Sequence, residues 1–119
     1  MSANPSRLLD EAVIADLFSM AGDAPGRAQL QELFRSFFAD AQQELGSSLA
    51  PGGDLAGLRP RLHRLKGMLG NYGFSGCADF IRRWEDEAAM GDHEGRRREL
   101  TELMQRTREE LIKRYPWMG

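Results

Sequence analysis

Apolar residues recur at intervals of three and four positions along most of the chain, which is the spacing of one face of an α-helix. Residues 58–74 show the pattern most clearly, because their positions separate into an apolar stripe and a polar face. The stripe consists of Leu58, Leu62, Leu65, Leu69 and Tyr72, and the polar face of Arg59, His63, Lys66, Gly67 and Gly70. The pattern predicts that the stripe packs and that the imidazole of His63 faces water, one turn from Lys66.

Two glycines lie on the polar face of this helix. Each costs about 1 kcal/mol relative to Ala inside a helix, so Gly67 and Gly70 need a compensating reason. Their position next to His63 indicates that the bare backbone leaves room for another surface. For Gly70, close packing between helices is the alternative.

Turn and capping residues divide the chain into one short helix and four longer ones. The short helix ends near Met20, and the longer helices cover about 27–49, about 54–72, 75–88 and the stretch from 93 to the residue before Pro116. The predicted N-caps are Asp10, Asp23, Asp54, Ser75 and Asp92, and Gly73 suits a C-terminal stop. Pro60 is awkward inside a helix, so either residues 54–58 form a separate turn or the helix kinks there.

The predicted fold class is all-α. No alternating apolar and polar run of useful length is present, so no strand is expected. Long helices joined by short connections favour antiparallel neighbours. The sequence therefore predicts an antiparallel up-and-down four-helix bundle with an additional short N-terminal helix, and residues 1–119 are expected to form a single domain.

Several large side chains are best explained as core. The three phenylalanines of the first long helix are Phe34, Phe37 and Phe38. Cys77 is predicted to be a small core residue, and Trp84 to be core, with a partner-binding groove as the alternative.

The apolar stripes of the four helices can satisfy one another, so a monomer is expected. An extra apolar patch around Phe74 or Trp117 would instead support a dimer. His93 follows a predicted turn, and we expect it to be exposed and to have no function.

The composition excludes several classes of function. The formal net charge is −2, with 41% hydrophobic and 29% charged residues, so the basic surface of a nucleic-acid binder is missing. A single cysteine and the lack of a secretory signal favour the cytoplasm. No apolar stretch approaches the roughly 18 residues needed to cross a membrane.

The sequence offers no metal site and no recognisable enzyme motif. Helical bundles build di-iron centres from Glu-x-x-His pairs, but here Pro60 and Met90 stand three positions before the two histidines. No nucleophile elbow, phosphate-binding Gly-rich loop or Cys/His pair of known spacing is present. We therefore expect no cofactor and no metal bound by the chain alone.

His63 remains as the candidate for chemistry. A neutral imidazole is a competent nucleophile toward an activated phosphoryl group. Lys66, with Arg59 or Arg64, could offset the negative charge that the phosphoryl group brings. Because this face has no acidic cluster to hold Mg²⁺, a partner must supply the metal and the leaving group.

The run His63-Arg64-Leu65-Lys66-Gly67, followed by Asn71 and Gly73, resembles the His-x-Leu-Lys-Gly motif of histidine-containing phosphotransfer (HPt) domains. These domains relay phosphoryl groups in bacterial two-component phosphorelays. The resemblance covers nearly the whole chain, through Leu9-Asp10, the Phe-rich helix, Arg83-Trp84-Glu85 and Gly91-Asp92.

The resemblance implies that His63 is phosphorylated, that Lys66 helps to hold the phosphate and that Gly67 lets a receiver domain close over the imidazole. The implied partners are response-regulator receiver domains, with a hybrid sensor kinase as a further candidate. No ATP-binding segment is present, so partners would supply the catalytic groups and Mg²⁺.

Four further residues are candidates for contact with the partner: Arg59, Arg64, Gly70 and Asn71. Asn71 could equally close the end of the helix. The chain departs from the family where Met68 and Leu69 replace residues that are often small, and where Pro60 precedes the histidine by three positions.

Two alternatives remain open. The chain could be a non-phosphorylated adaptor or inhibitor of the same fold, binding a kinase or regulator as a scaffold while His63 is idle. It could also be a helical interaction module unrelated to signalling, which burial of His63 would favour. Phosphorylation of His63 by a phosphorylated receiver domain distinguishes the carrier from the adaptor.

Overall fold

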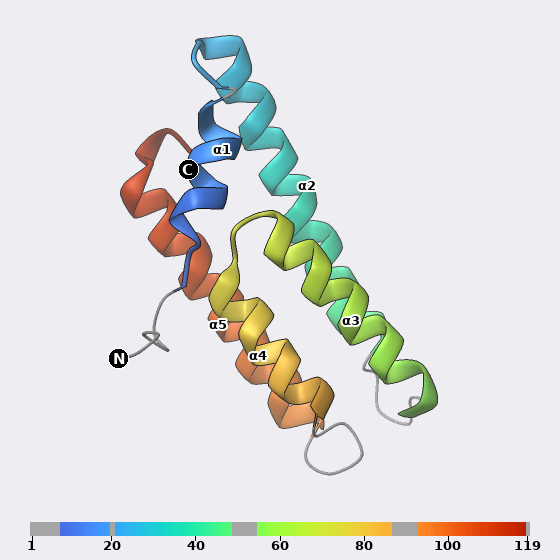
Figure 1. Cartoon of the computed structure of the whole chain (residues 1–119). Helices are drawn as coiled ribbons and strands as arrows, with labels where there is room; N and C mark the ends of the chain where they lie inside the picture. Colours follow the sequence, from blue (N-terminus) through green and yellow to red (C-terminus); the bar gives the residue numbers. More distant parts are fainter. Residues whose placement is uncertain (1–7, 20, 49–54, 87–92, 119) are drawn as a thin grey trace, which may run out of the picture.

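The computed structural model describes residues 8–19, 21–48, 55–86 and 93–118, and within these ranges all the regular secondary structure is helical, with no strand. The predicted all-α class is therefore confirmed. The elements are α1 (Glu11–Ser19), α2 (Ala24–Ser48), α3 (Leu55–Asn71), α4 (Ser75–Asp86), α5 (His93–Arg114) and the short 3₁₀ helix η1 (Pro116–Met118) (Figure 1).

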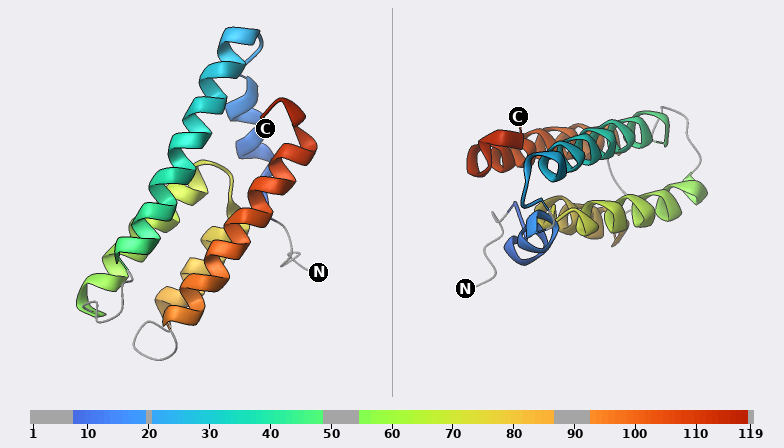
Figure 2. Two further views of the ribbon diagram at one scale, coloured as in Figure 1. Left: turned by 180° about the vertical axis from the view of Figure 1, so that it is seen from behind. Right: turned by 90° about the horizontal axis from the view of Figure 1, so that it is seen from above.

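The four longer helices lie in two layers. One layer holds α3 and α4, which make the most extensive contact between any two elements, and the other holds α2 and α5 (Figure 2). The short helix α1 lies against the N-terminal half of α2 and the C-terminal end of α5 (Figure 1). Its Phe18 ring contacts Phe34 of α2 and Tyr115 at the end of α5, with ring centroids 6.1 and 4.4 Å away.

Two aspartates cap helices as predicted. Oδ1 of Asp10 accepts hydrogen bonds from the backbone N–H groups of Ala12 and Val13 at 3.1 and 3.3 Å. Oδ1 of Asp23 accepts one from Gly26 at 2.8 Å. The second helix begins at Ala24 rather than near Arg27, because a proline in the first turn loses no intrahelical hydrogen bond.

The predicted cap at Ser75 is wrong. Ser75 is the first residue of α4, and its hydroxyl oxygen is buried without a hydrogen-bond partner among the described residues. The backbone carbonyl of Phe74 accepts the hydrogen bond from Ala78 instead. The other two predicted caps, Asp54 and Asp92, lie outside the described residues, as do Met20, Leu49 and Ala88.

Helix α3 runs without interruption from Leu55 to Asn71, so residues 55–58 belong to it rather than to a separate turn, and Pro60 lies inside the helix. The helix ends in a Schellman motif. The N–H of Phe74 donates to the carbonyl of Leu69 at 2.9 Å, and that of Gly73 donates to Gly70 at 3.1 Å. Gly73 adopts a φ of 81°, which is the left-handed conformation that favours glycine.

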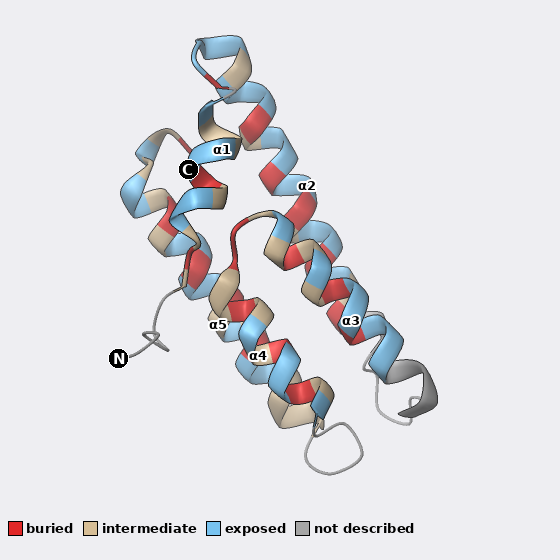
Figure 3. Ribbon diagram, viewed as in Figure 1, coloured by how far each residue is buried: buried red, intermediate tan, exposed pale blue. Residues whose placement is uncertain are grey.

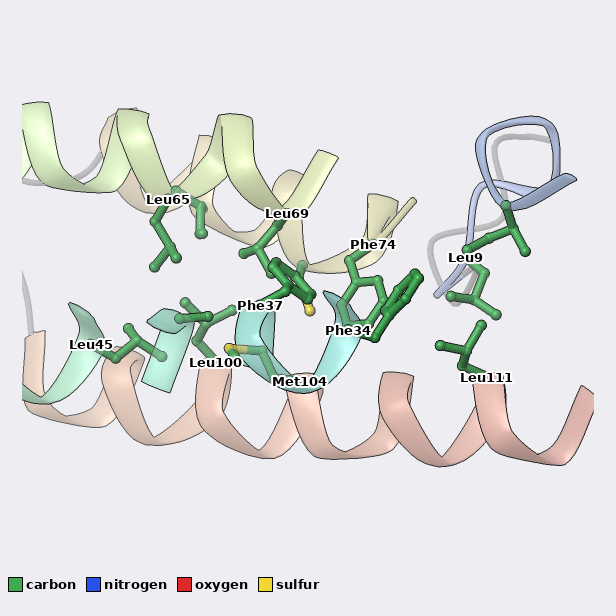
Figure 4. Close-up of a cluster of buried hydrophobic side chains, with 14 of the residues drawn as sticks. Leu9, Phe34, Phe37, Leu45, Leu65, Leu69, Phe74, Leu100, Met104 and Leu111 are labelled. Atoms are coloured by element: carbon green, nitrogen blue, oxygen red, sulfur yellow. The ribbon is translucent and has the colours of Figure 1, made fainter. Parts of the chain in front are cut away.

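The core fills the space between the two layers, and the outer faces of the helices are exposed (Figures 3 and 4). It includes Phe34, Phe37 and Leu45 from α2, Leu65 and Leu69 from α3, and Leu100, Met104 and Leu111 from α5. Phe38 is partly buried against it. Cys77 and Trp84 of α4 are buried, as predicted.

Phe74 and Trp117 do not form the outer apolar patch that the sequence left open as an alternative to a monomer. The side chain of Phe74 is buried in the core and cannot contribute to an outer surface. Trp117 is partly buried, with its ring 5.2 Å from that of Phe18 and the guanidinium of Arg27 over its face. The sequence pattern missed this because η1 folds back onto α1 and α2.

Candidate functional site

The side chain of His63 is 73% exposed in the middle of α3. Its position follows from the opposite face of the helix, where Leu62, Leu65 and Leu69 are almost completely buried against the core. Burial of these three leucines fixes the rotation of α3 about its axis and turns the imidazole toward solvent, as the helical spacing predicts.

Glu85 of α4 forms the second part of the site. One carboxylate oxygen, Oε2, lies 3.4 Å from Nδ1 of His63, and the other, Oε1, lies 2.7 Å from Nζ of Lys66. The Glu85 and Lys66 side chains are 17% and 27% exposed, so both are much less accessible than the imidazole. The carboxylate of Glu85 on α4 thus contacts both His63 and Lys66 on α3.

The contact between Glu85 and Lys66 is an ion pair rather than a well-aligned hydrogen bond. Their 2.7 Å separation is short enough for a hydrogen bond, yet Oε1 is buried and accepts none of acceptable angle from the described part of the chain. The ion pair therefore places the Lys66 ammonium beside Glu85.

The contact with Glu85 also distinguishes the two nitrogens of His63. A carboxylate oxygen next to Nδ1 favours the proton on that nitrogen. Nε2 of the neutral ring then keeps its lone pair, and the exposed side chain makes that nitrogen accessible to solvent.

Gly67 and Gly70 leave the surface beside His63 open. A Cβ atom added at either position would meet no atom of another residue within 4 Å. Neither glycine is therefore needed for close packing between the described helices, which removes the packing explanation for Gly70.

The other predicted contact residues, Arg59, Arg64 and Asn71, are exposed. Arg64 points toward α2, where its guanidinium lies 4.0 Å from the carboxylate of Glu44. Arg59 and Asn71 make no side-chain hydrogen bond or ion pair with any residue that the structure describes. The structure therefore brings Lys66 to His63, whereas Arg64 contacts a neighbouring helix.

The interpretation of His93 as an exposed residue without a role is wrong. The side chain is partly buried at the start of α5, and its Nδ1 accepts a hydrogen bond from the indole N–H of Trp84 at 3.1 Å. The two rings are nearly parallel, with an interplanar angle of 24°. His93 thus gives the buried Trp84 its polar partner.

Sequence reasoning assigned no role to Glu85. The residue was part of the family pattern, and it follows the buried Trp84, which places it at the edge of the buried face of α4. That position indicates that Glu85 could reach a neighbouring helix. Which carboxylate of α4 contacts α3, however, depends on how the two helices pack.

Among the residues that the structure describes, no group of three or more His, Cys, Asp or Glu side chains is arranged to hold a metal ion. None of the helices described is both long and apolar enough to cross a bilayer. The site therefore consists of an accessible imidazole nitrogen, a nearby ammonium and a carboxylate that contacts both.

A family model described as Hpt domain matches residues 29–111, which include all of α3 and α4. No curated protein and no solved structure matches the chain.

Proposed function

The chain belongs to the Hpt domain family, whose members are phosphocarrier modules of two-component signalling, and we propose that His63 carries the phosphoryl group. His63 exchanges this group with aspartates of response-regulator receiver domains, and a hybrid sensor kinase is a further candidate partner. The exposed imidazole with Nδ1 against Glu85 is the observation that supports this proposal best.

In the proposed step, Nε2 of His63 attacks the phosphorus atom of a receiver aspartyl phosphate. The N–P bond forms as the P–O bond to the aspartate breaks, and the aspartate leaves as a carboxylate. The proton on Nδ1 stays next to Glu85, whose negative charge stabilises the positive charge that develops on the ring. Transfer to the next aspartate reverses these events, and the receiver supplies Mg²⁺ in both directions.

Lys66 stabilises the phosphoryl group in this proposal. Its ammonium already lies 2.7 Å from Glu85, one helical turn from the imidazole. A phosphoryl group on His63 brings about two negative charges, which compete with Glu85 for Lys66. Arg59 is the further cation on this face, whereas the contact between Arg64 and Glu44 favours a role for Arg64 at the edge of the partner interface.

The docking surface of the receiver is proposed to centre on Gly67 and Gly70, with Asn71 at its edge. Open space above both glycines supports this assignment, because the loops of a receiver active site must approach His63 closely. The scaffold is the antiparallel four-helix bundle with the short helix α1. We propose that residues 1–119 act as one such domain in the cytoplasm.

Phosphoryl transfer to the purified protein from a phosphorylated receiver domain tests the proposal. We expect the wild-type protein to gain an acid-labile label and the His63→Gln variant to gain none. Arg61→Gln is a matched control, because Arg61 is exposed on α3 and lies on a different face from His63.

The same experiment separates the carrier from the adaptor. If a receiver binds but labels neither the wild type nor the variant, the chain is an adaptor. If the His63→Gln variant gains as much label as the wild type, a residue other than His63 accepts the phosphoryl group.

A further inference from the structure

A pocket of about 300 Å³ lies between α2 and α5. Residues of α2, α5 and η1 line it, so it belongs to the layer opposite α3 and α4, which carry His63 and Glu85 (Figure 2). The volume is at the lower end of the range of about 300 to 1,000 Å³ that is typical of ligand pockets.

The floor of the pocket is apolar. Phe34, Leu111 and Met118 are buried beneath it, and Phe38 and Ile112 are partly buried at its sides. Phe38 and Ile112 keep part of their carbon surface accessible, and burial of an apolar ligand against it is favourable.

One end of the pocket is fixed by the C-terminal segment. The side-chain amide of Gln31 donates a hydrogen bond to the backbone carbonyl of Trp117, which attaches η1 to α2. Met118 follows directly and contributes to the lining. This end of the pocket is therefore built by residues far apart in the sequence.

The rim carries two cations and no anion. Arg35 reaches the pocket from α2 and Arg108 from α5, and none of the lining residues is acidic. The Arg108 guanidinium lies over the Phe38 ring, 5.6 Å from its centroid, and forms no ion pair with any described residue. Within the part of the chain that the structure describes, Arg35 pairs with the exposed Glu32 at 3.4 Å, and such a surface pair is easily exchanged.

We propose that this pocket binds an amphipathic monocarboxylate. Its apolar body lies on Phe38 and Ile112, above the buried Phe34, and its carboxylate lies between Arg35 and Arg108, whose planar guanidinium groups match a carboxylate. The lining of α2 extends over residues 31–42, roughly 16 Å of helix at about 1.5 Å per residue, and this elongated shape suits an alkyl chain. Binding requires no residue of the His63 face.

Titration of the ¹⁵N-labelled full chain with dodecanoate, below its micelle-forming concentration, tests the proposal. We expect saturable amide shifts at Ala39, Gln42 and Gln105, which line the pocket. Arg108→Gln should weaken binding about tenfold, the loss expected for one charge-assisted hydrogen bond. Arg82→Gln is the matched control, because Arg82 is an equally exposed arginine on α4.

A second variant covers the case in which Arg108→Gln perturbs the fold. Ala39→Leu adds an apolar side chain at an exposed position of the lining and should block the alkyl chain without removing a core residue. His63→Gln should bind dodecanoate as the wild type does, whatever the outcome of the phosphoryl-transfer experiment.

Three results would overturn the proposal. The first is binding of dodecyltrimethylammonium at the same amides with equal affinity, which would make the pocket a surface that accepts any alkyl chain. The second is a titration in which the amides of the lining show no saturable shift, even if amides of α3 and α4 do shift. The third is unchanged affinity in both Arg108→Gln and Ala39→Leu.

Discussion

Glu85 contacts two side chains at once, and Glu85→Gln removes its charge while keeping its size. Without the carboxylate, the proton on Nδ1 of His63 loses its ionic partner. We expect phosphoryl acceptance to be about tenfold slower, because the positive charge that develops on the ring loses an opposite charge 3.4 Å away, and such a pair contributes about 1 kcal/mol or more at a protein surface. The rate of labelling by a phosphorylated receiver measures the effect.

Asp86→Asn is the control for Glu85→Gln, because it removes a carboxylate from the next, exposed position of α4. Equal rates for Glu85→Gln and the wild type would show that the carboxylate does not assist the transfer.

Cys77 makes the free energy of unfolding depend on pH in the alkaline range. Its thiol is buried with Sγ 3.6 Å from the Thr107 hydroxyl, and burial raises its pKa from 9.0 to about 11. The unfolded chain therefore releases this proton first as pH rises. The stabilising contribution is complete below about pH 9 and is lost toward pH 11, a loss of up to about 2 to 3 kcal/mol.

Urea unfolding at about pH 8 and about pH 10.5 measures this effect. In Cys77→Ala, the free energy of unfolding should fall less between the two pH values than it does in the wild type. Parallel decreases in both proteins would assign the alkaline loss to other groups.

At this scale the sequence predicts the residues that share one helix and misses those that meet across helices. His63 and Lys66 are one turn apart, so helical spacing alone places them together. Glu85 and His93 act through contacts with a neighbouring helix, at 3.4 Å from His63 and 3.1 Å from Trp84. Those distances depend on the rotation and separation of packed helices, which the spacing along one helix does not determine.

At the scale of the elements, the turn between α3 and α4 depends on Gly73. An alanine there would have to adopt a φ of 81°, and its Cβ would lie 2.9 Å from the Ile14 side chain of α1. A left-handed residue other than glycine costs about 1 to 2 kcal/mol. We expect Gly73→Ala to lower the free energy of unfolding by at least this amount in a urea titration.

Gly22→Ala is the matched control, because a Cβ at Gly22 meets nothing within 4 Å. Its stability should stay within about 0.5 kcal/mol of the wild type, as for most exposed substitutions. A similar loss in both variants would mean that the strain at Gly73 is not the cause.

The boundaries of the helices were predictable where one local interaction decides them. Asp10, Asp23 and Gly73 act through hydrogen bonds or dihedral angles within a few residues, and the sequence places all three correctly. Ser75 was misplaced, because its hydroxyl is buried when α4 packs. Pro60 could not be resolved from sequence, since packing can hold a helix together across a missing backbone hydrogen bond.

At the scale of the whole molecule, the two layers offer a receiver domain two different surfaces. A transient interface buries less than about 1,200 Å² in total, which is too little to cover both layers. We expect addition of a receiver domain to shift the amide signals of Gly67 and Gly70 and to leave those of Gln42 and Gln105 unchanged. If only the amide signals of Gln42 and Gln105 shift, the receiver domain binds the layer of α2 and α5 instead.

The helical class follows from the sequence, because each apolar stripe requires burial against another. The pocket between α2 and α5 could not be predicted from the sequence. Its volume depends on how far these two helices separate and on η1, which closes one end through Gln31 and Trp117. A periodic pattern predicts that two faces meet but not how closely.

The hydrogen bond between Trp84 and His93 also gives the protein an optical reporter. Indole fluorescence is sensitive to a neighbouring imidazole, which quenches the emission strongly when it is protonated. Trp84 and Trp117 are the two tryptophans of the chain, so Trp117→Phe leaves Trp84 as the single emitter. Because this hydrogen bond joins α4 to α5, the emission intensity of Trp84 would follow the packing of these two helices without any attached dye.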